Sequence, residues 1–268
     1  MPFRVELPPT FAERVRELGA GEYLAGMWVC SGSPTAAEIA AASGMQWVLL
    51  DAEHSPLTLD TTTRLLQAMN GYPATPVVRV PANDRVLVKQ FLDLGAQNVI
   101  VPMVDTKADA EEAARAVLYP PRGVRGVGSA LARASRWNAV PGYLDRAADL
   151  VSLTVQIESA TAVDNAAEIA AVDGVDAVFV GPSDLAASMG LLGQQTHQDV
   201  TDAVLHTFDV VRAAGKLVGV NAFDPAQARK YLDAGASFVL VGSDVGLMMN
   251  GARAWADTWV RDAEDDGA

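Results

Sequence analysis

Two acidic residues stand just after two strands that the sequence predicts. Residues 152–157 form a largely apolar, β-prone run that ends at Glu158, and residues 177–180 form a second run that leads to Asp184. Carboxylates that follow successive buried strands are how a barrel presents oxygen ligands to a hard divalent cation. Taken alone, Asp184 is better interpreted as a helix cap and Glu158 as a solvated strand end. Taken together, the two residues favour a metal site.

Two further polar residues occupy comparable positions in the first half of the chain. His54 follows a predicted buried strand, which suits a general base near neutral pH. Arg79 ends another such strand, where an unpaired buried charge would be costly. A substrate carboxylate or oxyanion would satisfy Arg79 through charge-assisted hydrogen bonds, and pairing with Asp51 or Glu53 is the structural alternative.

Short β-rich runs alternate with helical patterns over most of the chain. The runs are apolar on both faces, which is typical of parallel strands covered by helices. Eight such units in 268 residues predict a single-domain (β/α)8 barrel, with an open doubly wound sheet as the alternative. The predicted strands are 24–29, 47–51, 76–80, 98–101, 152–157, 177–180, 217–220 and 238–241. We assign residues 1–22 to an N-terminal extension or helix, 23–261 to the barrel and 262–268 to an acidic tail.

Residues 119–141 interrupt this alternation. The segment is rich in Gly, Pro and Arg and has no clear periodicity. Loops this long inside compact domains are usually functional or disordered. An anion-attracting lid and an oligomer contact or solvated surface loop are equally compatible with its composition.

Composition excludes several classes of protein. The formal charge of −13 argues against a nucleic-acid partner, and the single cysteine, Cys30, excludes an intrachain disulfide framework. No apolar run is long enough for a membrane span, and the N-terminus lacks the apolar core of a signal peptide. A cytoplasmic location is therefore the default expectation.

The same residues carry a family resemblance. Segments 47–54 (WVLLDAEH), 122–130 (RGVRGVGSA), 134–138 (ASRWN), 156–158 (QIE) and 180–185 (VGPSDL) follow one another in the order seen in metal-dependent, class II pyruvate aldolases. Over roughly residues 26–247 the chain most resembles the 4-hydroxy-2-oxoheptane-1,7-dioate aldolase group of aromatic-acid degradation. The resemblance implies reversible retro-aldol cleavage of a 4-hydroxy-2-oxo acid to pyruvate and an aldehyde, through a metal-stabilised enolate.

The resemblance also assigns roles by position. It implies that Glu158 and Asp184 bind Mg²⁺, Mn²⁺ or Co²⁺, that Arg79 stabilises the enolate oxygen, and that His54 transfers protons with support from Asp93. The remaining implied substrate contacts are Gln156 and the backbone around Gly181, Pro182 and Ser183, while Trp28 either walls the pocket or belongs to the core. Family members are barrels whose last helix swaps between subunits, usually in hexamers.

Alternative activities would each require particular residues. The four lysines lie in helices or before a strand, which disfavours a Schiff-base aldolase. A citryl- or malyl-thioester lyase would need a coenzyme A pocket, for which the Arg-rich loop is the only basic candidate. A sugar-acid aldolase and a non-catalytic keto-acid-binding protein are further alternatives. Ala52 and Ser183 depart from the usual Gly and Ala of the family and put substrate preference in question.

Overall fold

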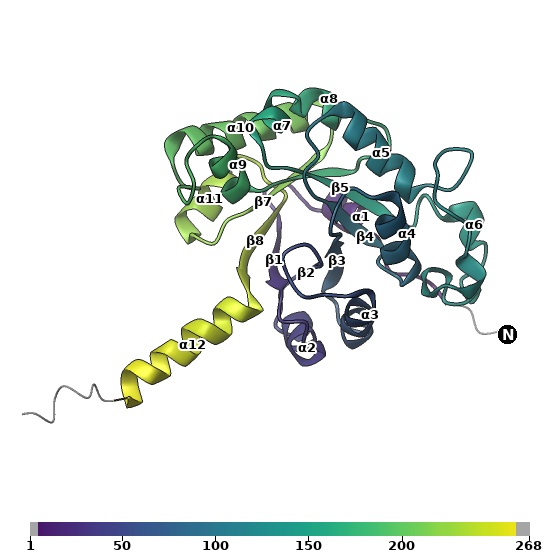
Figure 1. Ribbon diagram of the computed structural model, residues 1–268, viewed down its shortest axis with the longest axis horizontal. Helices are drawn as coiled ribbons and strands as arrows, with labels where there is room; N and C mark the ends of the chain where they lie inside the picture. The colour runs from purple at the N-terminus through teal and green to yellow at the C-terminus, as the bar shows by residue number, and fades with distance from the viewer. Residues whose placement is uncertain (1–4, 261–268) are drawn as a thin grey trace, which may run out of the picture.

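The computed structural model describes residues 5–260 and contains a closed barrel of eight parallel strands in sequence order (Figure 1). The strands are β1 (Leu24–Val29), β2 (Trp47–Asp51), β3 (Thr75–Arg79), β4 (Asn98–Val101), β5 (Ser152–Ile157), β6 (Ala177–Val180), β7 (Leu217–Asn221) and β8 (Phe238–Ser243). β1 pairs with both β2 and β8, which closes the barrel. The predicted (β/α)8 barrel is confirmed and the open sheet is excluded.

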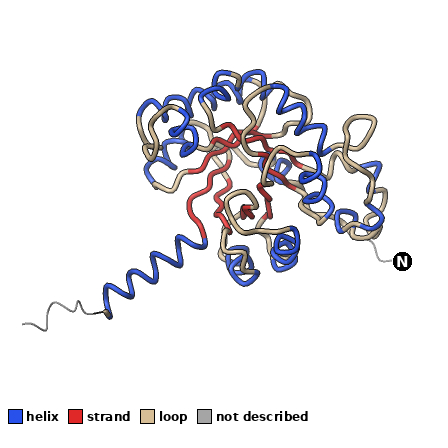
Figure 2. Tube along the Cα trace, in the orientation of Figure 1, coloured by secondary structure: helices blue, strands red, loops and turns tan. Residues whose placement is uncertain are grey.

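Helices surround the strands (Figure 2). They are α1 (Phe11–Arg16), α2 (Pro34–Ala42), α3 (Leu59–Ala68), α4 (Arg85–Asp93), α5 (Lys107–Val117), α6 (Tyr143–Arg146), α7 (Ala160–Asp164), α8 (Ala166–Ala170), α9 (Pro182–Ser188), α10 (Gln198–Ala213), α11 (Pro225–Asp233) and α12 (Asp244–Trp259), with 3-10 turns η1 (Ser129–Leu131) and η2 (Arg133–Ser135). Gly44, Gly95 and Gly235 follow α2, α4 and α11 with φ of 96°, 100° and 100°. These values match the left-handed helix ends expected of glycine. No helix in this part of the chain is long and apolar enough to cross a membrane.

Aromatic residues fill the barrel and close its N-terminal end. Phe11 of α1 lies 5.0 Å from the rings of both Trp47 and Phe238, and its backbone N–H donates to Asn98 Oδ1 at 2.7 Å. Trp47, Phe179 and Phe238 are fully buried. The segment expected as an N-terminal extension therefore contains the helix that plugs the barrel. The open end is the one at which the strands have their carboxyl termini.

The Arg-rich loop lies at the plugged end, because it connects the end of α5 to the start of β5. Its Arg125 is buried, donates from Nη2 to Asp93 Oδ1 at 2.9 Å and stacks on the ring of Tyr119. The loop therefore does not cover the open end of its own barrel, where a lid would have to act.

Helix α12 leaves the barrel altogether (Figure 1, yellow). Its first residue is anchored, because the Asp244 carboxylate accepts hydrogen bonds from the N–H groups of Cys30 and Ser31 at 2.9 and 3.1 Å. Beyond that point the helix exposes large apolar side chains, among them Trp255 at 75% and Trp259 at 81%. The tail expected at 262–268 lies outside the described residues.

The close packing of Trp47 against Gly26 predicts that a larger residue at position 26 destabilises the protein. A Cβ built on Gly26 would lie 2.5 Å from the indole of Trp47, which has no free volume to move into. Gly26→Ala should therefore lower the free energy of unfolding by about 1–3 kcal/mol through overpacking. Gly242→Ala is the matched control, because nothing lies within 4 Å of its Cβ position. If urea unfolding gave the same free energy of unfolding for both variants, the close packing of Gly26 against Trp47 would be contradicted.

Candidate active site

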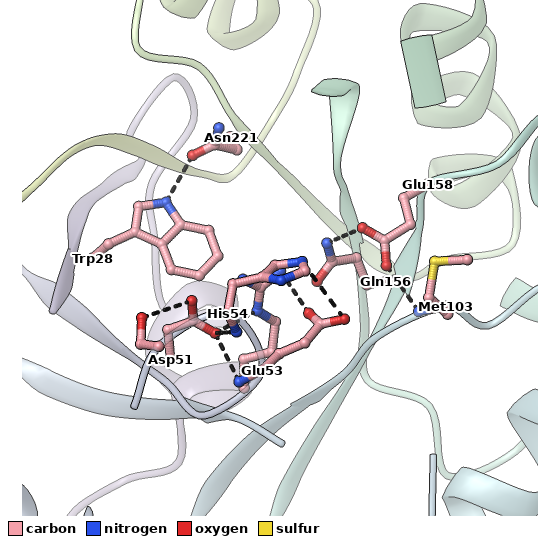
Figure 3. Close-up of polar contacts among 10 residues, drawn as sticks. Trp28, Asp51, Glu53, His54, Met103, Gln156, Glu158 and Asn221 are labelled. Atoms are coloured by element: carbon pink, nitrogen blue, oxygen red, sulfur yellow. Dashed lines mark hydrogen bonds and ion pairs between the residues drawn. The ribbon is translucent and has the colours of Figure 1, made fainter. Parts of the chain in front are cut away.

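Side chains from seven of the eight strands or their following loops surround a cavity of about 250 Å³ at the open end of the barrel. The lining residues are Trp28, Cys30, Asp51, His54, Arg79, Gln156, Phe179, Gly181, Pro182, Ser183, Asp184, Asn221, Phe223 and Ser243. Most of the predicted site residues therefore meet in one place. Figure 3 shows their polar contacts, with Trp28, Asp51 and Glu53 on one side and Gln156, Glu158 and Met103 on the other.

Arg79 sits between two carboxylates at the floor of the cavity. Its Nε donates to Asp51 Oδ1 at 3.0 Å, and its Nη1 lies 2.9 Å from Glu53 Oε2. The guanidinium carbon lies 4.4 Å from the ring centroid of Trp28. Among the described residues Nη2 has no hydrogen-bond partner, so one corner of the guanidinium remains available to a substrate oxygen. Arg79 can thus keep its charge in the protein and still bind an anion.

The two carboxylates around Arg79 respond differently to their surroundings. Burial raises the pKa of Asp51, but the hydrogen bond and charge of Arg79 and the N–H groups of Glu53 and His54 outweigh it, so the pKa falls below its usual value. Burial raises the pKa of Glu53, and the charge of Arg79 offsets this only in part. Asp51 is therefore the firm anionic partner of Arg79.

Glu158 is 2% exposed and lies beyond the end of β5. Its Oε1 accepts from the Met103 N–H at 2.8 Å, and its Oε2 accepts from Gln156 Nε2. Burial, together with the charges of Asp184 and Glu53, raises the pKa of Glu158 to about 7, although the hydrogen bond from the Met103 N–H and the charge of Arg79 oppose this shift. Such a carboxylate gains stability from a nearby cation.

Asp184 supplies the second acidic group. It lies in the first turn of α9, is exposed, and does not cap the helix, because the N-cap position belongs to Gly181. Its charge raises the pKa of Glu158 and of Glu53, which means that the three carboxylates lie within electrostatic reach of one another.

Gly181, just after β6, lies so close to the side chains at the end of β5 that a larger residue would not fit. A Cβ at this position would lie 2.8 Å from Glu158 Oε2 and 2.9 Å from Gln156 Nε2. The Gln156 Oε1 atom is buried without a partner in the described part of the chain. Two carboxylates and an unpartnered amide oxygen suit Mg²⁺ or Mn²⁺, which keep several waters. The described residues hold no cluster of three or more His, Cys, Asp and Glu side chains that would form a closed protein cage.

Trp28 both lines the cavity and packs in the core, the two roles that the sequence left open. Its ring packs against the buried Phe179, and its Nε1 donates to Asn221 Oδ1 at 2.8 Å. Asn221 thereby fixes the indole beneath Arg79. The contributions of Asn221 and of the Met103 backbone were missed by sequence reasoning. Met103 is a non-glycine residue with a φ of 52°, a conformation that no sequence pattern signals.

His54 lies at the rim of the cavity. Its side chain is 65% exposed, and its Nε2 is 3.9 Å from Glu53 Oε1. The Asp51 carboxylate holds this turn by accepting from the backbone N–H groups of Glu53 and His54 at 3.1 and 3.3 Å. The imidazole therefore has room to meet a substrate.

Asp93 is not brought to His54 within one subunit. It is the last residue of α4, just before β4 begins, and so lies at the plugged end of the barrel. Its carboxylate is paired with Arg125.

Lysines are placed as the sequence predicts. Lys89, Lys107 and Lys230 lie on α4, α5 and α11, and Lys216 lies just before β7. Lys216 Nζ donates to the carbonyl groups of Val172 and Val175, away from the cavity. No lysine of the described chain lines the cavity, so the site offers no amine for a Schiff base.

The closed (β/α)8 barrel, with its polar cavity at the carboxyl ends of the strands, defines the chain as a barrel enzyme, because such barrels carry their active sites at that end. Residues 24–251 match the family described as HpcH/HpaI aldolase/citrate lyase, and the chain belongs to this family. It is an aldolase, a carbon–carbon lyase that releases pyruvate by retro-aldol cleavage. The resemblance stated from the sequence is thus confirmed. Members of this family generally depend on a divalent metal.

Two kinds of aldolase are similar to this chain over nearly its whole length. A hydroxypyruvate/pyruvate aldolase of Deinococcus radiodurans is 48% identical and covers 96% of this chain and 92% of its own. A 4-hydroxy-2-oxo-heptane-1,7-dioate aldolase of Salmonella heidelberg is 45% identical and covers 94% and 95%.

Among solved structures, an HpcH/HpaI aldolase/citrate lyase family protein of Burkholderia cenocepacia is 39% identical, with a TM-score of 0.87 and coverage of 92% of this chain and 97% of its own. The citrate lyase beta subunit of M. tuberculosis, solved with oxaloacetate and magnesium, shares the fold at 18% identity and a TM-score of 0.57, covering 85% and 93%.

The raised pKa of Glu158 predicts how pH controls metal binding. A carboxyl whose folded pKa is raised stabilises the fold while protonated, and this contribution is lost as pH rises through about 7. The metal-free protein is then left with a buried anion that a cation would neutralise. Mn²⁺ should therefore raise Tm more at about pH 8 than at about pH 5.5, where a proton competes for the site.

Glu158→Gln tests the assignment, since it removes the titrating group and should abolish the pH-dependent part of the Mn²⁺ shift. Glu13→Gln, a remote capping residue on α1, is the control and should keep it. An equal Tm gain at both pH values in the unaltered protein would show that Glu158 does not bind the cation.

Proposed function

We propose that the enzyme cleaves a 4-hydroxy-2-oxo acid to pyruvate and an aldehyde with a divalent cation, Mg²⁺, Mn²⁺ or Co²⁺, held by Glu158 and Asp184. The observation that carries this proposal is the buried Glu158, which is destabilised as an anion by its burial and by Asp184 and lies behind Gln156 and Gly181 of the cavity lining. When bound, the cation polarises the 2-oxo group and offsets the negative charge that builds on its oxygen.

Arg79 supplies the second positive charge at that oxygen. The free Nη2 corner of its guanidinium faces substrate, while Asp51, Glu53 and the Trp28 ring hold the rest of the group in place. A preorganised donor of this kind stabilises an enolate without rearranging during the reaction.

The first turn of α9 suits the pyruvate carboxylate. Pro182 has no N–H, and the N–H groups of Ser183 and Asp184 have no hydrogen-bond acceptor in residues 5–260. Gly181 keeps this turn close to Gln156, whose amide contacts the substrate. The carboxylate and the 2-oxo group would thus be fixed from the same side of the cavity.

His54 is the group that moves a proton to and from the 4-hydroxyl. Its exposed position at the rim suits a substrate atom that lies toward the aldehyde side of the cavity. Support of His54 by Asp93 would require a second subunit, because Asp93 lies at the other end of its own barrel.

The thioester-lyase alternative is less favoured. Its only basic candidate for a coenzyme A pocket, the loop at 119–141, packs at the plugged end of the barrel rather than beside the cavity.

Replacing Arg79 tests the mechanism. Arg79→Ala should lower kcat for pyruvate release by about 10²–10³-fold, the loss typical of one oxyanion donor. Arg85→Ala, an exposed arginine on α4, should keep full activity. Coupled detection of pyruvate gives the rate, and exhaustive chelation followed by Mn²⁺ addition gives the metal dependence. Retained kcat in Arg79→Ala, or full activity after metal removal, would refute the proposed mechanism.

We propose further that the enzyme is a cytoplasmic homo-oligomer, a hexamer by family resemblance, in which α12 packs against a neighbouring subunit. The exposed Trp255 and Trp259 on a helix that leaves its own barrel support this assignment, because large exposed apolar faces are usually covered by a partner.

Light scattering tests the role of α12. The double variant Trp255→Ser and Trp259→Ser should have a lower molar mass than the unaltered protein, because it loses apolar area that only association would bury. Leu192→Ser, 81% exposed but outside α12, should leave the mass unchanged. An unchanged mass in the tryptophan variant would exclude α12 as the main contact.

A further inference from the structure

Two arginines converge at the plugged end of the barrel, far from the proposed metal site. A Cβ built on Gly95 would lie 2.5 Å from Arg133 Nη1 and 3.1 Å from Arg136 Nη1, so both guanidinium groups reach over the same glycine. We call Arg133 and Arg136 the arginine pair. Arg136, Trp137 and Asn138 are consecutive non-glycine residues with φ of 51°, 53° and 66°. Left-handed backbone is strained in such residues, and strain of this kind concentrates at functional sites.

The arginine pair has no acidic partner among residues 5–260. Arg133 Nη1 donates to the carbonyl of Leu94 at 3.2 Å, and Arg136 Nη1 donates to the carbonyl of Arg133 at 2.7 Å. The carboxylate of Asp93 is already engaged by Arg125. The other N–H groups of the pair donate to no protein acceptor in this part of the chain.

The charges of the pair are unfavourable to each other. Burial and the charge of Arg136 together lower the pKa of Arg133 to about 10. Burial also lowers the pKa of Arg136. Two half-buried cations without a counter-charge are stabilised by an anion that both can reach.

A cavity of about 310 Å³ adjoins the pair. Leu66, Met69 and Pro76 form apolar parts of its wall, and Arg14 and Glu17 line it as well. Arg14 Nη1 is occupied by the carbonyls of Gln46 and Pro73 and by Thr75 Oγ1, and the exposed Glu17 is the single carboxylate in the lining. The cavity therefore offers a cationic end and an apolar body at the size of a small-molecule site.

We propose that this cavity binds a small organic anion, with its carboxylate or phosphate group between Arg133 and Arg136 and its apolar part against Leu66 and Met69. Guanidinium groups bind such oxyanions through paired N–H donors. The aromatic plug of Phe11, Trp47 and Phe238 separates the cavity from the active site, so this is a second site. A bound anion would contact both the left-handed turn that follows η2 and the end of α4.

Calorimetric titration of the full chain tests the site. Inorganic phosphate and benzoate are the probes, in low-chloride buffer without Mn²⁺ or pyruvate, because pyruvate is itself a small carboxylate that would compete for the site. Saturable binding with one anion per subunit is expected. Tighter binding of benzoate assigns a carboxylate ligand with an apolar body, and tighter binding of phosphate assigns a phosphorylated one. Absence of binding by both probes overturns the proposal.

Variants locate the binding. Arg133→Gln and Arg136→Gln should each weaken the preferred probe at least tenfold, whereas Arg229→Gln, an exposed arginine on α11 with the same change in charge, should not. Glu158→Gln should bind the probe like the unaltered protein, so that loss of the proposed catalysis and loss of this site are distinguished.

Two outcomes of the variant series contradict the proposal. Equal affinity in Arg133→Gln and the unaltered protein shows that the anion binds elsewhere, and a lower molar mass of the variant shows that a second copy of the chain covers the pair. If the glutamine variants do not fold, Arg133→Lys keeps the charge but loses the paired donors. It should fold and bind the probe more weakly, and unchanged affinity would overturn the assignment.

Discussion

The site depends on the balance of charges at the open end of the barrel. Asp51, Glu53, Glu158 and Asp184 meet one arginine there, so the carboxylates outnumber the cationic groups. Arg79 forms ion pairs with Asp51 and Glu53, whereas Glu158 has two hydrogen bonds but no ion pair among the described residues. Burial makes this deficit costly, and a cation removes it. In the proposed mechanism, a divalent cation offsets this same deficit of positive charge.

The barrel supports this balance by fixing each group on a different strand. β2 carries Asp51, β3 carries Arg79, β5 leads into Glu158 and β6 into Asp184. Because parallel strands end together, groups distant in sequence reach one cavity without long loops. The aromatic plug of Phe11, Trp47 and Phe238 fills the other end of the barrel. Gly181 shows how close the fit is, since even a methyl group there would meet Glu158 and Gln156.

The plugged end shows the opposite imbalance. Arg125 is matched by Asp93, whereas Arg133 and Arg136 lie on a left-handed turn without a carboxylate in the described chain. In a chain with a formal charge of −13, a half-buried pair of cations is a local exception. We thus propose different partners for the two ends of the barrel: a cation at the carboxyl ends of the strands, and an anion at the plugged end.

The pattern of residues along the chain was enough to predict the fold and most of the cavity lining. Eight apolar runs separated by helical patterns predicted the barrel to within a few residues, because burial on both faces leaves a direct pattern. The positions after the strands predicted His54, Arg79, Gln156 and Asp184 at one end, because parallel strands end together. How these groups pair became clear from the folded structure. Arg79 pairs with Asp51 and Glu53, and the backbone N–H of Met103 donates to Glu158. Asp93 pairs with Arg125 of the Arg-rich loop at the plugged end of the barrel. Such pairings depend on distances across the barrel, and residue spacing along the chain does not encode them.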